Sequence, residues 1–253
     1  MLRRTNAIVL KTLPFGEADL IVTHFTYDFG LINTFAKSPR KIKSRFGSSL
    51  EPLTCSKISF WGKEDAQLPR LTQSDIILSF QELRESWNCF LKVSEIAELT
   101  ANFLPEREAN KKVFTLLLNT LKTAKKDCNL LLDTILYKIR FLNFIGYAPR
   151  LDGCGRCGNA GLSFYIAHGS VICEKCATGM NRPIKLSPGS IKLYESLSKW
   201  DDPAIGRIKP SGELLSELSS MINDHIIYTL SRPLRSHAFH KLKPARCCDS
   251  KPG

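Results

Sequence analysis

The chain has 253 residues, 43% of them hydrophobic, and its 36 Lys and Arg outnumber 24 Asp and Glu to give a formal net charge of +12. This length suits one large domain or two to three small ones, each with a hydrophobic core. No apolar run approaches the roughly 18 residues of a membrane span, and the first apolar segment stops at Lys11, too early for an export signal. We therefore expect a cytoplasmic protein without membrane contact, and the charge indicates an anionic partner, most often nucleic acid.

Residues 1 to about 80 have the pattern of short strands separated by turns. Strand-like runs cover residues 7–13, 19–26, 30–36, 53–61 and 67–77, and turn signals separate the first three at residues 14–16 and 28–30. Five short strands in this length predict a small closed barrel, and the OB-fold is the five-stranded barrel of that size. Other five-stranded barrels would give the same pattern. We place the first domain at residues 1–80.

From Phe80 onward the apolar period changes to three or four residues. Helical runs are predicted from Phe80 to Pro105 and at residues 113–121, 131–145, 187–199 and 215–226. The helix over 131–145 is expected to stop at Gly146 and Pro149. The predicted fold class is multidomain α+β, in which a mainly α-helical second domain covers residues 81–253 and ends in a basic tail at about 240–253.

Four cysteines form two Cys-x-x-Cys pairs with fifteen residues between them: Cys154, Cys157, Cys173 and Cys176. Two such pairs can surround one Zn²⁺ ion with a tetrahedron of thiolates, and the strand-like segment between them predicts a zinc ribbon at about residues 150–180. Four protein ligands leave no open position, so we expect one structural Zn²⁺ rather than a catalytic one. Redox dithiols or free cysteines are the alternative. The other five cysteines show no ligand spacing, and reduced thiols are expected for them.

A dense basic run extends from Lys37 to Arg45 and contains no acidic residue. Its cations are Lys37, Arg40, Lys41, Lys43 and Arg45. Pro39 keeps the run in a loop, and we expect it to contact nucleic-acid phosphates, with Arg3 and Arg4 joining from the barrel edge. A solvated loop without a partner is the alternative.

Three phenylalanines of the first domain are candidates for base stacking, because barrel-type nucleic-acid binders often use aromatic platforms: Phe15, Phe35 and Phe46. A place in the barrel core is an equally good interpretation for Phe35.

Several of these segments together carry a family resemblance. In the first domain they are Ala7–Leu10, Phe15–Asp19, Lys43–Gly47 and Leu50–Pro52; later come Gly146–Leu151, leading into Cys154, and Leu230–Ser236. The combination resembles the bacterial DNA repair and recombination protein family RecO over almost the whole chain. It departs from that family at Ser38-Pro39, where the family tends to have a glycine, and after Phe239.

The resemblance implies a non-enzymatic mediator with an OB-fold, a helical domain and a zinc ribbon. Proteins of this family bind single- and double-stranded DNA and anneal complementary strands. With RecR they load RecA onto DNA coated by single-strand binding protein (SSB), whose acidic C-terminal tail docks on the helical domain. RecF is a possible further partner, and a nucleoid location follows from these activities.

Two other functions stay open. An RNA-binding OB-fold protein would have the same basic barrel. A zinc-dependent nuclease is the other alternative, but the chain has no His-Glu-x-x-His pair and no Gly-Lys-Ser/Thr phosphate loop, and its five histidines lack ligand spacing.

Overall fold

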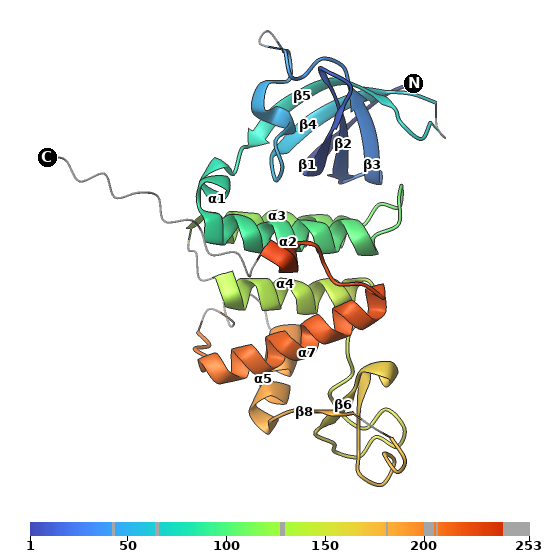
Figure 1. Ribbon diagram of the computed structural model, residues 1–253, viewed down its shortest axis with the longest axis vertical. Coiled ribbons are helices and arrows are strands. Elements are labelled where there is room, and N and C mark those ends of the chain that lie inside the picture. The colour runs from blue at the N-terminus through green and yellow to red at the C-terminus, as the bar shows by residue number, and fades with distance from the viewer. Residues whose placement is uncertain are drawn as a thin grey trace, which may run out of the picture.

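The computed structural model describes residues 1–41, 44–63, 66–126, 130–180, 182–199, 205 and 207–239. A β-barrel, a layer of helices and a small sheet follow one another along the long axis (Figure 1). Within the described residues, no helix combines the length and apolar character needed to cross a membrane.

The barrel closes in the strand order β1-β2-β3-β5-β4, which confirms the predicted OB-type fold. Its strands are β1 (Leu2–Phe15), β2 (Asp19–Thr26), β3 (Gly30–Ala36), β4 (Cys55–Trp61) and β5 (Arg70–Leu78), and the short 3-10 helix η1 (Gly47–Leu50) precedes β4. All neighbouring strands are antiparallel except β3 and β5. The interior is filled by side chains such as Val9, Val22 and Ile58, as the two-residue period of a strand requires.

The register of β1 shifts at a bulge between Val9 and Lys11. Such a bulge adds one residue to the strand and changes which positions face the interior. Before it, Ile8 and its partner Phe25 lie on the outer face of the barrel, where they join the core formed with the helices.

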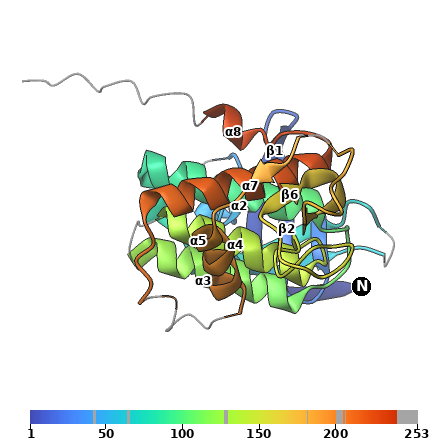
Figure 2. The ribbon, with the colours of Figure 1, turned by 90° about the horizontal axis from the view of Figure 1, so that it is seen from below.

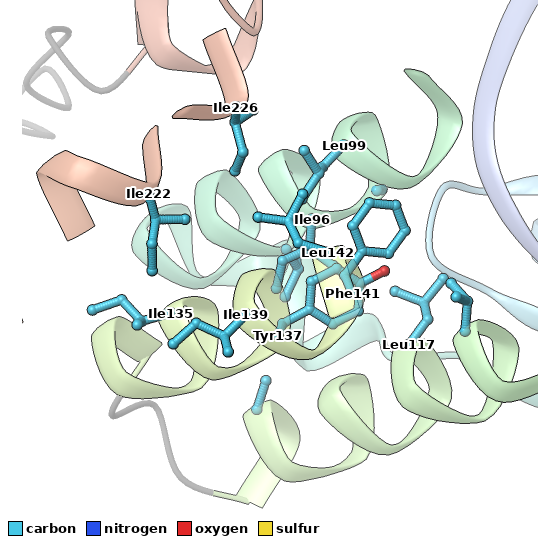
Figure 3. Packing of buried hydrophobic residues seen from close by; sticks show 14 of the residues in the cluster. Ile96, Leu99, Leu117, Ile135, Tyr137, Ile139, Phe141, Leu142, Ile222 and Ile226 are labelled. Carbon is cyan, nitrogen blue, oxygen red and sulfur yellow. The ribbon is translucent and has the colours of Figure 1, made fainter. Parts of the chain in front are cut away.

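The helical part consists of α1 (Gln81–Glu85), α2 (Trp87–Phe103), α3 (Lys111–Lys126), α4 (Leu130–Phe144), α5 (Pro188–Lys199), α7 (Gly212–Leu230) and α8 (Ser236–Phe239). The first predicted helix is interrupted: Ser86 has an extended backbone (φ −93°, ψ 112°) that separates α1 from α2. Helix α4 lies in the centre, in contact with α2, α3, α5 and α7. Figure 3 shows Tyr137 and Phe141 of α4 surrounded by aliphatic side chains from the neighbouring helices.

A buried ion pair crosses this helical core. The Lys138 ammonium on α4 donates to the Glu95 carboxylate on α2 and, at 2.7 Å, to Oδ1 of Asn223 on α7. Both charged side chains are almost fully buried. The three polar groups therefore fix how α2, α4 and α7 meet, because separating Lys138 from Glu95 would leave a buried charge unpaired, and moving Asn223 away would cost the ammonium a hydrogen bond.

One continuous hydrophobic cluster joins the barrel to the helices. Outward-facing barrel residues such as Phe25 and Leu31 pack with Phe114 and other helical side chains. The α2–α3 connection also pairs with β3, where the Arg107 N–H donates to the carbonyl of Leu31 at 2.9 Å. Gly30 has a φ of +66°, and a Cβ there would lie 2.2 Å from the carbonyl oxygen of Glu108. The connection and the barrel thus touch through their backbones.

The small sheet is formed by β6 (Ser163–Tyr165), β7 (Ser170–Ile172) and β8 (Ile184–Lys185), in the order β7-β6-β8, and the 3-10 helix η2 (Ile166–His168) connects its first two strands. It lies between α4 and α5 in the sequence and over one end of the helices in space (Figure 2). This insertion agrees with the predicted ribbon. The division into domains at residue 80 stays a prediction.

Candidate functional site

The four cysteine sulfurs of the small sheet form one cluster, in which all of them lie within 4.8 Å of one another. The Sγ atoms of Cys157 and Cys173 are 3.6 Å apart. Four sulfurs at about 2.3 Å from one Zn²⁺ ion would be separated by about 3.8 Å, so the arrangement fits a tetrahedral zinc site. Among the described residues this is the single group of three or more potential metal ligands that lie together.

The backbone around the cysteines has the local geometry of a zinc knuckle. Gly158 has a φ of +79°, as expected for the residue after Cys157, and its N–H donates to the carbonyl of Cys154 at 2.8 Å. Gly155 has no room for a side chain, because a Cβ would lie 2.4 Å from Oγ of Ser170. The glycines let the first knuckle lie against β7.

The two faces of the small sheet have different neighbours. Tyr165 and Ile172 pack with the cysteine cluster, whereas Phe164 and Val171 belong to the helical core. The ring of Phe164 meets His225 of α7 edge-on at 5.9 Å. The cysteine cluster therefore lies on the far side of the sheet from the helices, and a bound metal would hold the inner face in place.

The cysteines differ in their surroundings. The pKa of the Cys154 thiol falls to about 6, chiefly because the backbone N–H of Cys173 donates to it, and this favours the thiolate form that binds metal. Outside the cluster, burial raises the pKa of Cys55 to about 11. Cys89 is disulfide-bonded, so the expectation of reduced thiols is wrong for this residue.

The basic run forms an exposed loop after β3. Lys37, Arg40, Lys41 and Arg45 are all exposed, whereas Lys43 lies outside the described residues. Within the loop, Ser38 has a φ of +58°, and its N–H donates to the Asp19 carboxylate at 2.6 Å. These contacts fix the start of the loop and leave its cations pointing into solvent.

Arg3 and Arg4 lie on opposite faces of β1, although both were expected to contact phosphates from the barrel edge. Arg4 is exposed on the outer face of the barrel, while Arg3 is half-buried and lies 5.5 Å from the ring centre of Phe29. Arg3 also lines a cavity of about 430 Å³ with Phe60 and Lys63. The alternation of side chains along a strand explains the separation.

Of the three phenylalanines, Phe46 is 3% exposed and belongs to the barrel core, so the prediction that it stacks on bases is wrong. Arg45 covers its ring at 4.9 Å. Phe15 is 52% exposed and meets the partly exposed Phe35 edge-on at 5.9 Å. These two remain candidates for stacking. The basic tail at 240–253 lies outside the described residues.

A second basic surface, which we call the basic helical cavity, was not predicted from the sequence. It has a volume of about 660 Å³, and its lining includes Lys111, Lys112, Leu116, Arg140, Phe144 and Lys199, with no acidic residue. Lys111 approaches Asp28 at 4.0 Å, and Lys199 approaches Glu195 at 3.8 Å; both are exposed pairs of small energetic weight. No local sequence pattern marks this cavity, because its cations come from α3, α4 and α5, which are far apart in the sequence.

Comparison with known families assigns nearly the whole described chain. Residues 1–80 match the family described as "Recombination protein O N terminal", and residues 88–238 match "Recombination protein O C terminal". The chain belongs to the RecO family. The resemblance seen in the sequence is thereby confirmed.

Relatives with the name "DNA repair protein RecO" cover most of the chain. The protein from Thermodesulfovibrio yellowstonii is 45% identical over 232 residues, which are 89% of this chain and 92% of the relative. The protein from Dehalococcoides mccartyi is 33% identical over 233 residues, 90% of this chain and 91% of the relative. That from Syntrophus aciditrophicus is 32% identical over 241 residues, 92% and 93% of the two chains.

The backbone of Ser38 has the left-handed conformation that favours glycine. The Asp19 carboxylate, which accepts the Ser38 N–H, helps hold a residue other than glycine in this conformation.

Proposed function

We propose that this protein is a non-enzymatic DNA repair and recombination mediator that binds single- and double-stranded DNA and anneals complementary strands. The observation that carries the proposal is an OB-type barrel with an exposed cationic loop in a chain of the RecO family. Phosphates supply most of the binding free energy for such a surface, so affinity should fall as salt rises.

The loop assignment is tested by charge reversal. Arg40→Glu with Lys41→Glu should weaken binding to single-stranded DNA and lower the salt slope by about 0.7 for each lost phosphate contact. Arg207→Glu with Lys209→Glu is the matched control, because both residues are exposed and lie between α5 and α7, and the net charge changes equally. Equal affinities and slopes for the two double variants would refute the assignment.

We assign the SSB tail to the basic helical cavity. An acidic tail of this kind needs positive side chains beside an apolar pocket, which Lys112 and Phe144 offer together. Lys112→Glu and Phe144→Ala should each weaken binding of an SSB tail peptide in calorimetry. Arg207→Glu, in the connection before α7, and Tyr228→Ala, on α7, are controls of the same type outside this cavity. Unchanged affinity in both test variants would exclude this cavity.

In the same proposal RecR joins the protein to load RecA onto SSB-coated DNA, with RecF as a further partner, at the nucleoid. A reconstituted loading assay tests this step. It should show RecA filament formation on SSB-coated single strands when the protein and RecR are both present, and no gain when either is omitted.

One Zn²⁺ ion, held by the four cysteines, has a structural role in this proposal. The close sulfur cluster supports it, because four thiolates complete the coordination and leave no position for water or substrate. An ion in this site would contribute free energy of folding to the ribbon.

The two alternatives have direct tests. Competition between DNA and RNA of one sequence would reveal an RNA-binding protein if RNA bound more tightly. Cleavage of labelled DNA in the presence of magnesium, manganese or zinc would reveal a nuclease. The four-thiolate cluster offers no open coordination site for such cleavage.

A further inference from the structure

The register of the barrel places apolar and aromatic side chains in one row on its outer face. Directly paired residues of neighbouring strands point to the same side of a sheet. Following the pairs from β1 through β2, β3, β5 and β4 back to β1 gives Leu13, Ile21, Phe35, Arg70, Trp61 and Leu2. We call this set the outer row. It contains no acidic residue.

The outer row is open to solvent around Trp61. The Trp61 side chain is 60% exposed, an unusual position for the largest apolar side chain. It is the cross-strand partner of Arg70 on one side and of Leu2 on the other. Arg4 lies two residues along β1 from Leu2 and therefore on the same face, diagonal to Trp61.

Both arginines are suited to bind an anion. Arg4 and Arg70 are exposed, and within the described part of the chain neither forms an ion pair. Lys57 is exposed further along the same face of β4. An aromatic ring between two uncommitted arginines matches single-stranded nucleic acid, which presents flat bases and phosphates in alternation.

The outer row also connects Trp61 to the other candidate contacts. Phe35 is paired with Arg70, and Phe15 lies edge-on against Phe35. Two strand spacings, about 10 Å, separate Phe35 from Trp61. Strand β3 runs from Phe35 directly into the basic loop that begins at Lys37.

We propose that Trp61, flanked by Arg4 and Arg70, is a base-stacking site for single-stranded DNA, and that the strand continues past Phe35 to the basic loop. The inference rests on the proposed function, since it assigns residues to DNA binding by this protein. It favours DNA over a second copy of the chain because the arginines repel their own copies and attract phosphates.

The test measures fluorescence anisotropy of a labelled oligo(dT) of about 15 nucleotides, within the range that one OB-fold covers. Trp61→Leu, which keeps an apolar side chain without a ring, should lower the affinity of the full-length protein at least fivefold. Trp61→Phe should retain most of the affinity. Tyr228→Ala, which removes an exposed ring from α7, is the control and should bind like the wild type.

Two further measurements separate stacking from charge. An abasic strand of equal length keeps the phosphates and lacks the bases, so Trp61→Leu should bind it as well as the wild type does. Arg70→Gln should instead reduce the salt slope by about 0.7, while Trp61→Leu leaves the slope unchanged.

The failures are distinguishable. Wild type that does not bind oligo(dT) would overturn the proposed function and this inference together. Wild type that binds, with Trp61→Leu equally tight, would overturn this inference alone. A Trp61→Leu variant that loses self-association in sedimentation but keeps its DNA affinity would show that the outer row joins copies of the chain. Equal losses on abasic and oligo(dT) strands would also overturn stacking.

Discussion

The buried histidine of the barrel should make stability depend strongly on pH. His24 is fully buried among the barrel interior side chains, and its Nε2 lies 3.1 Å from Oγ1 of Thr34. Its Nδ1 has no partner among the described residues. Burial lowers the pKa of His24 from 6.5 to about 3, because a charged ring there would have no water around it.

The sign follows from proton linkage. In the unfolded chain the ring takes up a proton below about pH 6.5, whereas in the folded barrel it stays neutral down to about pH 3, so stability falls as the pH is lowered through this window. For these two pKa values, the loss between about pH 7.5 and pH 5 is about 2 kcal/mol of unfolding free energy.

The assay is urea unfolding of the full-length protein at both pH values, followed by circular dichroism. His24→Gln does not titrate and keeps a group able to bond Thr34, so it should lose about 2 kcal/mol less than the wild type between the two pH values. His225, whose pKa burial also lowers, is present in both proteins and cancels. His168→Gln, at an exposed site, is the control and should behave like the wild type.

The reasoning would be refuted if wild type and His24→Gln lost the same stability to within about 0.5 kcal/mol, a typical error of such comparisons. The folded barrel would then accept the charged ring.

Three further outcomes are expected. Lys138→Met alone should destabilise the protein by about 3–5 kcal/mol in urea unfolding, because it leaves the buried charge of Glu95 unpaired. Adding Glu95→Leu should restore most of the lost stability. A double variant less stable than Lys138→Met would contradict the role of the ion pair. Gly30→Ala should lower the free energy of unfolding by about 1–3 kcal/mol or more, since the left-handed backbone and the Glu108 carbonyl both oppose a Cβ. Gly16→Ala is the control: a Cβ at this exposed glycine would have no atom within 4 Å, so the loss of stability should be smaller. Removal of bound zinc with a strong chelator should open residues 150–180 to limited proteolysis while the barrel stays resistant. If chelation abolished DNA binding but left the proteolysis pattern unchanged, the ribbon would instead be a DNA contact surface.

The barrel and the ribbon were predictable because their signals are local. Alternation and turn residues mark the five strands, and the cysteine spacing marks the knuckles. The interruption at Ser86 was missed because the apolar period continues across it.

The contacts between distant segments could not be predicted from the sequence, because they depend on which face of the barrel each side chain occupies. Phe46 follows the basic loop and looked exposed, but it turns into the barrel beneath Arg45. The sequence did not mark Trp61 as a candidate contact, whereas its pairing with Arg70 places it on the outer face of the barrel. The face of each residue depends on the bulges and the barrel closure, which no single segment records.

The hydrophobic cluster shared by the barrel and the helices has a consequence for how partners would be brought together. Domains joined by a flexible linker sample many separations, whereas a large apolar interface holds them at one. The proposed DNA path on the barrel and the proposed SSB site on α3, α4 and α5 therefore keep a constant spacing. DNA released from SSB would therefore bind the barrel at a fixed distance and orientation from the site that still holds the SSB tail. The rigid interface between barrel and helices would set the geometry of the transfer.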